Sequence, residues 1–192
     1  MIRSILSFIL TGAFAILMNT QTHAADDHPV VVMETSMGSI TIELDRAKAP
    51  ITVDNFLKYV DAGFYDDLVF HRVIPNFMIQ GGGLDKNLRE KTKGVGKGIK
   101  NESDNGVSNK RGTIAMARTS DPDSATCQFF INHTDNRNLD AAPGRPGYAV
   151  FGHVTEGMDV VDKIAQVRTK RVGPHEAVPV ETIVIKSVKL KK

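Results

Sequence analysis

Short apolar runs, many with alternating apolar and polar residues, dominate the chain and predict β-strands rather than long helices. Residues 30–44 contain two such runs on either side of Ser36, Met37 and Gly38, which predicts a hairpin. The last run changes the face of its apolar residues near Ser187, which indicates a β-bulge. Further strands are predicted at 68–74, 77–80, 113–117, 128–132, 148–154 and 180–190.

Two segments have helical periodicity instead. Between Thr52, a candidate N-cap, and Gly63, a candidate C-terminal stop, apolar residues recur at i, i+3, i+4 and i+7. Residues 158–167 form a second, shorter amphipathic pattern. Many short strands, two helices and no alternation of strand and helix predict a mainly β fold, a closed or nearly closed antiparallel barrel whose ends are covered by helices.

The first 24 residues differ from the rest. Arg3 is followed by an almost entirely apolar run over 5–18, and the small residue Ala24 ends a short polar stretch. This pattern is typical of a secretory signal peptide that is cleaved after residue 24. A membrane anchor is the alternative, but the apolar run is short for a membrane span. We therefore expect a signal peptide over 1–24 and one domain over 25–192.

Composition excludes several classes of function. Without the first 24 residues the chain holds 23 basic and 22 acidic side chains, a net charge of +1, which predicts neither nucleic acid nor a membrane surface as partner. The one cysteine, Cys127, has no internal disulfide partner and is predicted to be a buried apolar side chain. The histidines have no metal-ligand spacing, so we expect no metal and no cofactor.

One arginine lies in an unusually apolar stretch, FHRVIPNFMIQGGG over residues 70–83. Strand alternation places Arg72 on the same face as Phe70, and Gln128 shares a face with Phe130 in the run CQFFIN. Two strands are thus expected to offer polar groups beside aromatic rings. From alternation alone, Arg72 is either directed at a ligand or held by a carboxylate such as Asp66 or Asp67.

Four motifs, in order, carry a resemblance to a known family. FHRVIPNFMIQGG, RGTIAMART, CQFFIN and GYAVFGHV closely resemble segments of the cyclophilin-type peptidyl-prolyl cis–trans isomerases, and the likeness extends from about Pro29 to Leu190. The chain resembles bacterial, exported members most. The resemblance implies an eight-stranded antiparallel barrel with two capping helices and an enzyme that rotates the peptide bond before proline.

The resemblance also implies roles for individual residues. Arg72 matches the catalytic arginine of the family, and Gln80 is expected to orient it or to bind substrate backbone. Ala117 and Arg118 match positions whose backbone meets the peptide, and Gln128 matches a polar residue that lines the site. The residues that match the proline pocket are Phe77, Met78, Phe130 and Leu139.

Three positions depart from common members of the family. Asn138 replaces a tryptophan that helps many eukaryotic members to bind cyclosporin, so we expect weak cyclosporin binding. Arg118 replaces an asparagine, which is expected to change side-chain preference and to leave catalysis intact. Tyr148 stands where many members have histidine.

We therefore expect a monomeric isomerase of the periplasm that assists the folding of exported proteins, with proline-containing polypeptides as its partners. No stable membrane association is expected once the signal peptide is removed. The alternative is a non-catalytic chaperone module that holds proline segments in the same pocket. A hydrolase is not indicated, because no activated nucleophile is evident.

Overall fold

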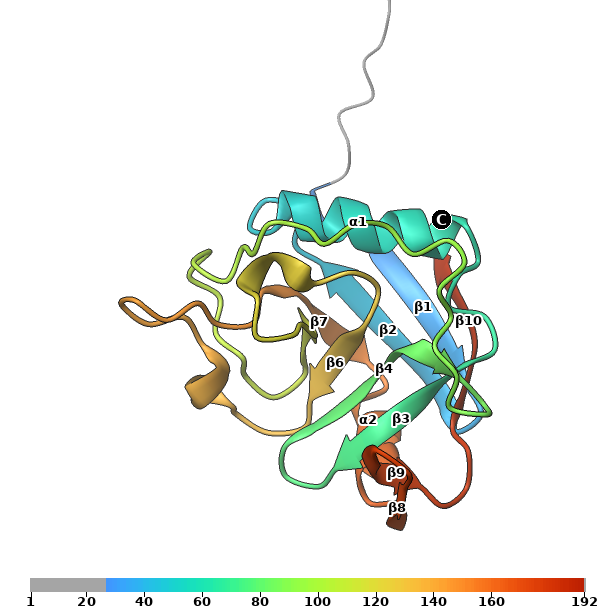
Figure 1. Ribbon diagram of the computed structural model, residues 1–192. Coiled ribbons are helices and arrows are strands. Elements are labelled where there is room, and N and C mark those ends of the chain that lie inside the picture. Colours follow the sequence, from blue (N-terminus) through green and yellow to red (C-terminus); the bar gives the residue numbers. More distant parts are fainter. Residues whose placement is uncertain (1–26, 192) are drawn as a thin grey trace, which may run out of the picture.

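Eight strands close into one antiparallel barrel in the computed structural model, which describes residues 27–191 (Figure 1). The predicted signal peptide lies outside the described residues. Around the barrel the strands follow the order β1, β10, β3, β4, β6, β5, β7 and β2. The bounds are Val30–Thr35 (β1), Gly38–Leu44 (β2), Leu68–Ile74 (β3), Met78–Asp85 (β4), Thr113–Met116 (β5), Phe129–Asn132 (β6), Val150–Glu156 (β7) and Val184–Leu190 (β10). The expected fold class is confirmed.

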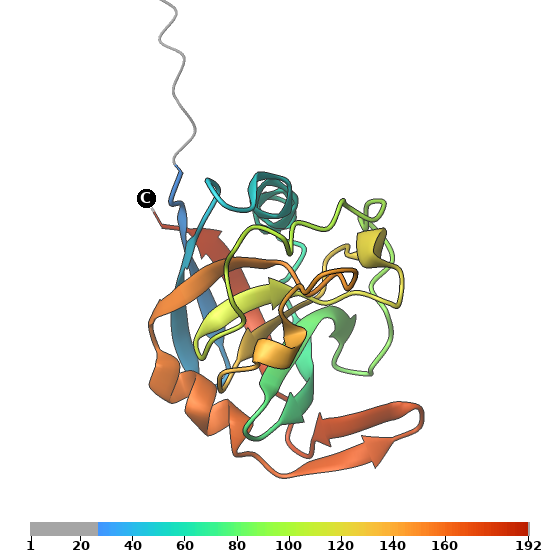
Figure 2. The same cartoon turned by 90° about the vertical axis from the view of Figure 1, so that its left-hand side faces the viewer.

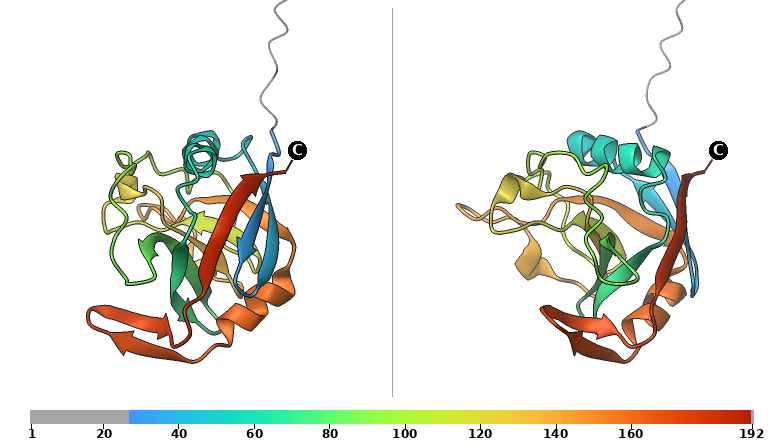
Figure 3. Two further views of the ribbon diagram at one scale, coloured as in Figure 1. Left: turned by 90° about the vertical axis from the view of Figure 1, so that its right-hand side faces the viewer. Right: turned by 45° about the vertical axis from the view of Figure 1, so that its right-hand side comes forward.

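The first hairpin and the bulge in the last strand are confirmed in detail. β1 and β2 pair from Val30 to Thr35 through a two-residue turn. Glu34 pairs with Ser187 but Thr35 pairs with Ile185, so one extra residue is accommodated in β10 between them. Figure 3 shows β10 beside β1, with the C-terminal end of the described chain at the same end of the barrel as the start of β1.

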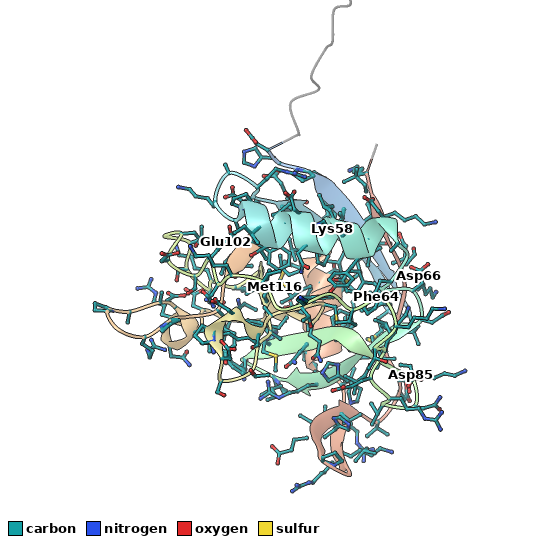
Figure 4. All side chains as sticks on the ribbon, turned by 45° about the horizontal axis from the view of Figure 1, so that its top comes forward. Lys58, Phe64, Asp66, Asp85, Glu102 and Met116 are labelled. Atoms are coloured by element: carbon teal, nitrogen blue, oxygen red, sulfur yellow. The ribbon has the colours of Figure 1, made fainter. Side chains whose placement is uncertain are left out.

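Helix α1, Pro50–Asp61, lies across one end of the barrel and begins earlier than the sequence predicted. Thr52 is not its N-cap. Ala49 occupies that position without a side-chain cap, and Pro50 starts the first turn, where its missing N–H costs nothing. The cap comes from elsewhere: Glu102 accepts hydrogen bonds from the backbone N–H groups of Ile51 and Thr52, at 3.1 and 2.8 Å. Figure 4 shows Glu102 beside this end of the helix.

Helix α2, Met158–Ala165, lies at the opposite end of the barrel from α1 (Figures 1 and 2). It is followed by a two-stranded hairpin that the sequence did not predict, β8 (Thr169–Val172) and β9 (His175–Pro179). This hairpin is separate from the barrel sheet and projects from its lower end in Figure 2. No helix within residues 27–191 combines the length and hydropathy that crossing a bilayer requires.

Strand alternation divides the buried apolar residues into two clusters. Side chains that point into the barrel, such as Ile79, Phe129 and Ile131, pack with α1 in one large core. Their neighbours Met78 and Phe130 belong to a second, smaller cluster with partly buried residues around it. The same two strands therefore fill the barrel with one face and build a second apolar surface with the other.

Candidate active site

Nine of the ten residues that the sequence singled out line one open cavity of about 260 Å³ on the second apolar cluster. The tenth, Gln128, lies in the adjoining depression and is joined to the cavity by a hydrogen bond to Gln80. Other cavities of the molecule are larger, so the lining rather than the size distinguishes this one. The lining residues are Arg72, Phe77, Met78, Gln80, Ala117, Arg118, Phe130, Leu139 and Tyr148.

Register across the sheet explains why residues so distant in sequence meet. Arg72 of β3 pairs with Gln80 of β4, and Gln80 pairs with Phe130 of β6. Phe130 in turn pairs with Ala115 of β5. Directly paired residues place their side chains on the same side of a sheet. A row that runs across four strands therefore sets a cation, an amide and an aromatic ring side by side at the cavity.

The guanidinium of Arg72 is held without a counter-charge. Its Nη1 lies 3.5 Å from Oε1 of Gln80 and 3.8 Å from the sulfur of Met78, and the group lies 5.9 Å from the ring centroid of Phe77. Within the described part of the chain no carboxylate forms an ion pair with it. Of the two interpretations left open by the sequence, a side chain held by Asp66 or Asp67 is therefore wrong.

The aromatic neighbour of Arg72 is not the one that alternation suggested. Phe70 is buried in the barrel core, where its ring contacts Phe129 edge-on at 6.2 Å. The pairing of β3 with β4 shifts register on both sides of Phe70, so simple alternation does not hold there. Phe77, at the end of the turn that joins the two strands, takes its place beside Arg72.

A second amide fixes the orientation of Gln80. Nε2 of Gln80 donates to Oε1 of Gln128 at 3.1 Å, which leaves Oε1 of Gln80 directed at Arg72. Gln128 can approach because Gly83 has no side chain: a Cβ there would lie 2.5 Å from Gln128. Gly82, with φ of +85°, likewise leaves room for the ring of Phe129. Two of the three glycines after Gln80, Gly82 and Gly83, are thus explained by these close approaches.

The other arginine of the site, Arg118, joins the cavity to the long loop 140–147. It donates from Nε to the carbonyl of Gly147 at 3.1 Å, from Nη2 to Pro146 at 2.9 Å and from Nη1 to Thr119 at 2.9 Å. Its guanidinium also lies 4.6 Å from the ring centroid of Tyr148, a cation–π distance. Tyr148 in turn meets Phe130 edge-on at 5.6 Å.

Sequence reasoning missed the residues that hold Phe77 in place. The carbonyl of Phe77 accepts from the backbone N–H of His133 at 2.9 Å and from Nδ2 of Asn136 at 2.8 Å. The imidazole of His133 accepts from the backbone N–H of Asn76 at Nδ1, at 3.0 Å, and its Nε2 lies 3.2 Å from Asp162 of α2. The only signal in the sequence was a polar run directly after an apolar strand.

Other kinds of site find little support in the described residues. No three histidine, cysteine, aspartate or glutamate side chains within residues 27–191 are grouped so that they could hold a metal. Cys127 is buried, and burial raises the pKa of its thiol, which disfavours the nucleophilic thiolate.

Comparison with known proteins agrees with this geometry. The family model described as cyclophilin type peptidyl-prolyl cis-trans isomerase matches residues 30–190. Peptidyl-prolyl cis-trans isomerase A of Dickeya dadantii is 51% identical over 178 residues, which cover 93% of this chain and 89% of that protein. A peptidyl-prolyl cis-trans isomerase of Acinetobacter baylyi is 56% identical over 162 residues, 84% of this chain and 85% of the relative.

A solved structure also matches the barrel. It is a cyclophilin type isomerase of Cryptosporidium parvum, crystallised in the presence of the dipeptide Ala-Pro, with a TM-score of 0.73 and 25% identity. The alignment covers 85% of this chain and 99% of that one. The chain therefore belongs to the cyclophilin-type peptidyl-prolyl cis–trans isomerase family, and rotation of the peptide bond before proline is its activity.

Proposed function

We propose that Arg72 is the catalytic group and that the surrounding cavity holds the proline ring of an exported polypeptide that folds in the periplasm. The observation that carries this proposal is the guanidinium itself. It lies beside the apolar side chains of the cavity, it is oriented by Gln80, and within residues 27–191 no carboxylate is paired with it. A cation in this position has its hydrogen bonds available for a substrate.

The chemistry needs only such a donor. Amide resonance sets a rotation barrier of roughly 18–20 kcal/mol, and the uncatalysed reaction takes tens to hundreds of seconds. When the bond is twisted, resonance is lost and the nitrogen becomes pyramidal with an available lone pair. A fixed guanidinium that donates to this nitrogen, or to the neighbouring carbonyl, stabilises the twisted state more than the planar one, which is the condition for catalysis.

The apolar residues have the complementary task. Phe77, Met78, Phe130 and Leu139 surround the space beside Arg72, and a proline ring fits the concave surface that they make. With the ring held, the segment before proline can turn about the amide bond. Arg72 is partly buried beside these residues, and the reduced contact with water strengthens its hydrogen bonds to the substrate.

The size of the effect follows from ordinary magnitudes. An acceleration of about 10⁴-fold requires about 5.5 kcal/mol of transition-state stabilisation. Removal of one preorganised hydrogen-bond donor from an active site typically costs about 10²–10³ in rate. Arg72 therefore accounts for about half to three quarters of the required stabilisation, and the grip on the proline ring supplies the remainder.

The test compares isomerisation of a proline peptide by the protein and by two variants. Arg72→Ala is expected to lower kcat/KM by about 10²–10³. Arg72→Lys is expected to recover little of it, because a lysine lacks the planar fork of donors. Arg171→Gln is the matched control, since it removes an exposed guanidinium from β8, outside the cavity. A folded Arg72→Ala protein with wild-type kcat/KM would exclude this role.

The proposed location rests on the N-terminal sequence pattern. Residues 1–24 combine a basic start, an apolar run and a small residue at the end, which is typical of export through a cleaved signal peptide. A fusion of residues 1–30 to a reporter enzyme that folds only outside the cytoplasm tests this directly. Activity of the reporter in the periplasm, with cleavage after Ala24 by mass spectrometry, supports export; a reporter that stays inactive in the cytoplasm contradicts it.

Two further expectations concern partners. Asn138, in the place of the tryptophan through which other members hold cyclosporin, is exposed, and weak cyclosporin binding is expected, to be checked by calorimetry. Large exposed apolar side chains are few in the described chain and belong to separate segments, at Ile51, Val180 and Leu190. This surface supports a monomer.

A further inference from the structure

Two arginines and no acidic residue line the proposed substrate cavity. Arg72 enters it from β3 and Arg118 from the segment that follows β5, and the remaining lining residues are neutral. Neither guanidinium forms an ion pair with any carboxylate in the part of the chain that the structure describes. Arginines near a protein surface are normally close to a carboxylate or fully solvated, so two uncompensated cations around one cavity make it a positively charged site.

The hydrogen bonds of Arg118 leave part of its guanidinium available. All three acceptors are neutral backbone carbonyls, of Thr119, Pro146 and Gly147, and none of them cancels the charge. A guanidinium has five N–H donors, so three are engaged and two remain. Because the side chain is only partly buried and lines the cavity, these donors are within reach of a ligand in it.

We propose that this cavity selects prolines that are flanked by an acidic side chain, and that Arg118 is the residue that recognises the carboxylate. The proposal rests on the proposed function, since it assigns a substrate class to the same site. In it, the proline ring occupies the apolar part of the cavity, and the carboxylate of the neighbouring residue meets the free N–H groups of Arg118. Arg72 contributes a second positive charge without giving up its contact to the rotating bond.

Three acidic residues of the segments that flank the cavity do not replace such a substrate. Asp121 and Asp123 lie beyond Arg118 in sequence, and their carboxylates accept backbone N–H groups, of Asp123 and Asn101 respectively. Asp140 accepts from Ser108 and from the backbone N–H of Asn109. None of the three lines the cavity. They weaken the positive potential at longer range but leave the short-range interaction with Arg118 open.

The expected discrimination is modest, because the site is partly exposed to solvent. Exposed ion pairs change affinity or rate by up to about fivefold. We therefore expect a glutamate beside proline to raise kcat/KM about threefold over glutamine, and about tenfold over lysine, which is repelled rather than attracted. The preference should decrease as salt is raised from about 20 mM to about 500 mM, since salt screens such pairs.

The experiment measures cis–trans exchange by NMR with the full mature protein in catalytic amounts. This readout needs no coupled protease, whose own specificity would distort the comparison. The substrates are blocked pentapeptides that differ at one position only, with glutamate, glutamine or lysine placed directly before proline in one series and directly after it in the other. The proposal predicts a preference for glutamate in at least one series.

Three variants separate charge from loop anchoring. Arg118→Gln removes the charge and is expected to abolish the difference between glutamate and lysine peptides. Arg118→Lys keeps the charge but not the three hydrogen bonds to carbonyls, and is expected to keep most of the preference. Lys58→Gln, an exposed position on α1, removes one charge outside the cavity and is expected to change nothing.

Each result decides the matter. Equal kcat/KM for glutamate and lysine peptides in both series overturns the proposal while leaving the isomerase assignment intact. The proposal is also overturned if the preference for glutamate survives in Arg118→Gln, or if Arg118→Lys loses the preference as Arg118→Gln does. In either case Arg118 is assigned to anchoring the loop. Absence of exchange catalysis with every peptide would instead contradict the proposed function, so the two failures are distinguishable.

Discussion

Acidification is expected to destabilise the fold through one buried histidine. His71 follows Phe70 on β3 and is only 6% exposed. The pKa of His71 is lowered to about 4, mainly by burial; a hydrogen bond with the backbone of Val69 opposes this shift, and the nearby charges of His175 and Arg72 contribute to it. In the folded protein the imidazole is therefore neutral at pH values where an unfolded chain already binds the proton.

The sign and size of the effect follow from this difference. Between pH 6.5 and 4 the unfolded state binds more protons than the folded state, so the free energy of unfolding falls as the pH is lowered. With pKa values of about 6.5 unfolded and about 4 folded, the loss reaches about 2.5 kcal/mol by pH 4.5. A loss of this size is a large fraction of the stability of a typical domain.

Carboxylates act in a lower range of pH. Burial alone would raise the pKa of Asp140, but its hydrogen bonds with Asn109 and Ser108 together outweigh burial and lower it; the pKa of Asp162 is lowered mainly by its hydrogen bond with Arg111. Stability that depends on these two groups is complete above the ordinary carboxyl pKa of about 4 and is lost only below it. The interval between pH 6.5 and 4.5 therefore reports chiefly on histidine.

Urea unfolding of the mature protein at half-unit steps from pH 7 to 4.5 measures the effect. The matched variant is His71→Gln, which removes the titrating group and is expected to flatten the pH dependence, whatever its own stability at pH 7. His28→Gln serves as control, because its side chain is 57% exposed. A wild-type free energy of unfolding that is constant over this range, or a slope that persists in His71→Gln, would refute the reasoning.

Three further substitutions have expected outcomes. Glu102→Gln weakens the acceptor for two helix N–H groups and the hydroxyl of Thr52, and should lower the free energy of unfolding by about 1–2 kcal/mol in urea titrations; an unchanged value would contradict capping from a distance. His133→Ala removes the acceptor for Asn76 and should raise KM for proline peptides by a few fold with a smaller change in kcat, because the turn that presents Phe77 is less well held; an unaltered KM would argue against this role. Gln128→Ala frees Gln80 and should lower kcat about tenfold, because Arg72 is then less well oriented, with little change in thermal stability. A wild-type kcat in a peptide assay would show that Gln128 does not orient Arg72 through Gln80.

Much of the fold was accessible from the sequence because its signals are local. The hairpin at Ser36 and Met37, the bulge next to Ser187 and the positions of most strands follow from alternation over a few residues. The site residues are a different case. Their grouping followed from the resemblance of four motifs to a family, whereas alternation alone left the environment of Arg72 undecided.

What could not be predicted depends on contacts between distant segments. Glu102 caps α1 from 51 residues away, and nothing in the local sequence of the helix indicates this. Alternation placed Phe70 on the same face as Arg72 because it assumes an unbroken ladder, and a shift in register sends the ring of Phe70 into the barrel instead. The hairpin of β8 and β9 was missed because it has few buried residues to create a periodic pattern.

The arrangement of β6 implies that barrel packing and substrate binding are coupled. Phe129 fills the barrel, where its ring contacts Phe56, Tyr65 and Phe70, while the next residue, Phe130, faces the cavity. A smaller side chain at Phe129 would leave a void that the surrounding core closes only in part. Any shift of β6 that reduces this void moves Phe130, and with it the wall against which the proline ring rests. The packing of the barrel core therefore keeps the cavity rigid. A tightly packed barrel suits this enzyme because its catalysis depends on holding the substrate and Arg72 in position.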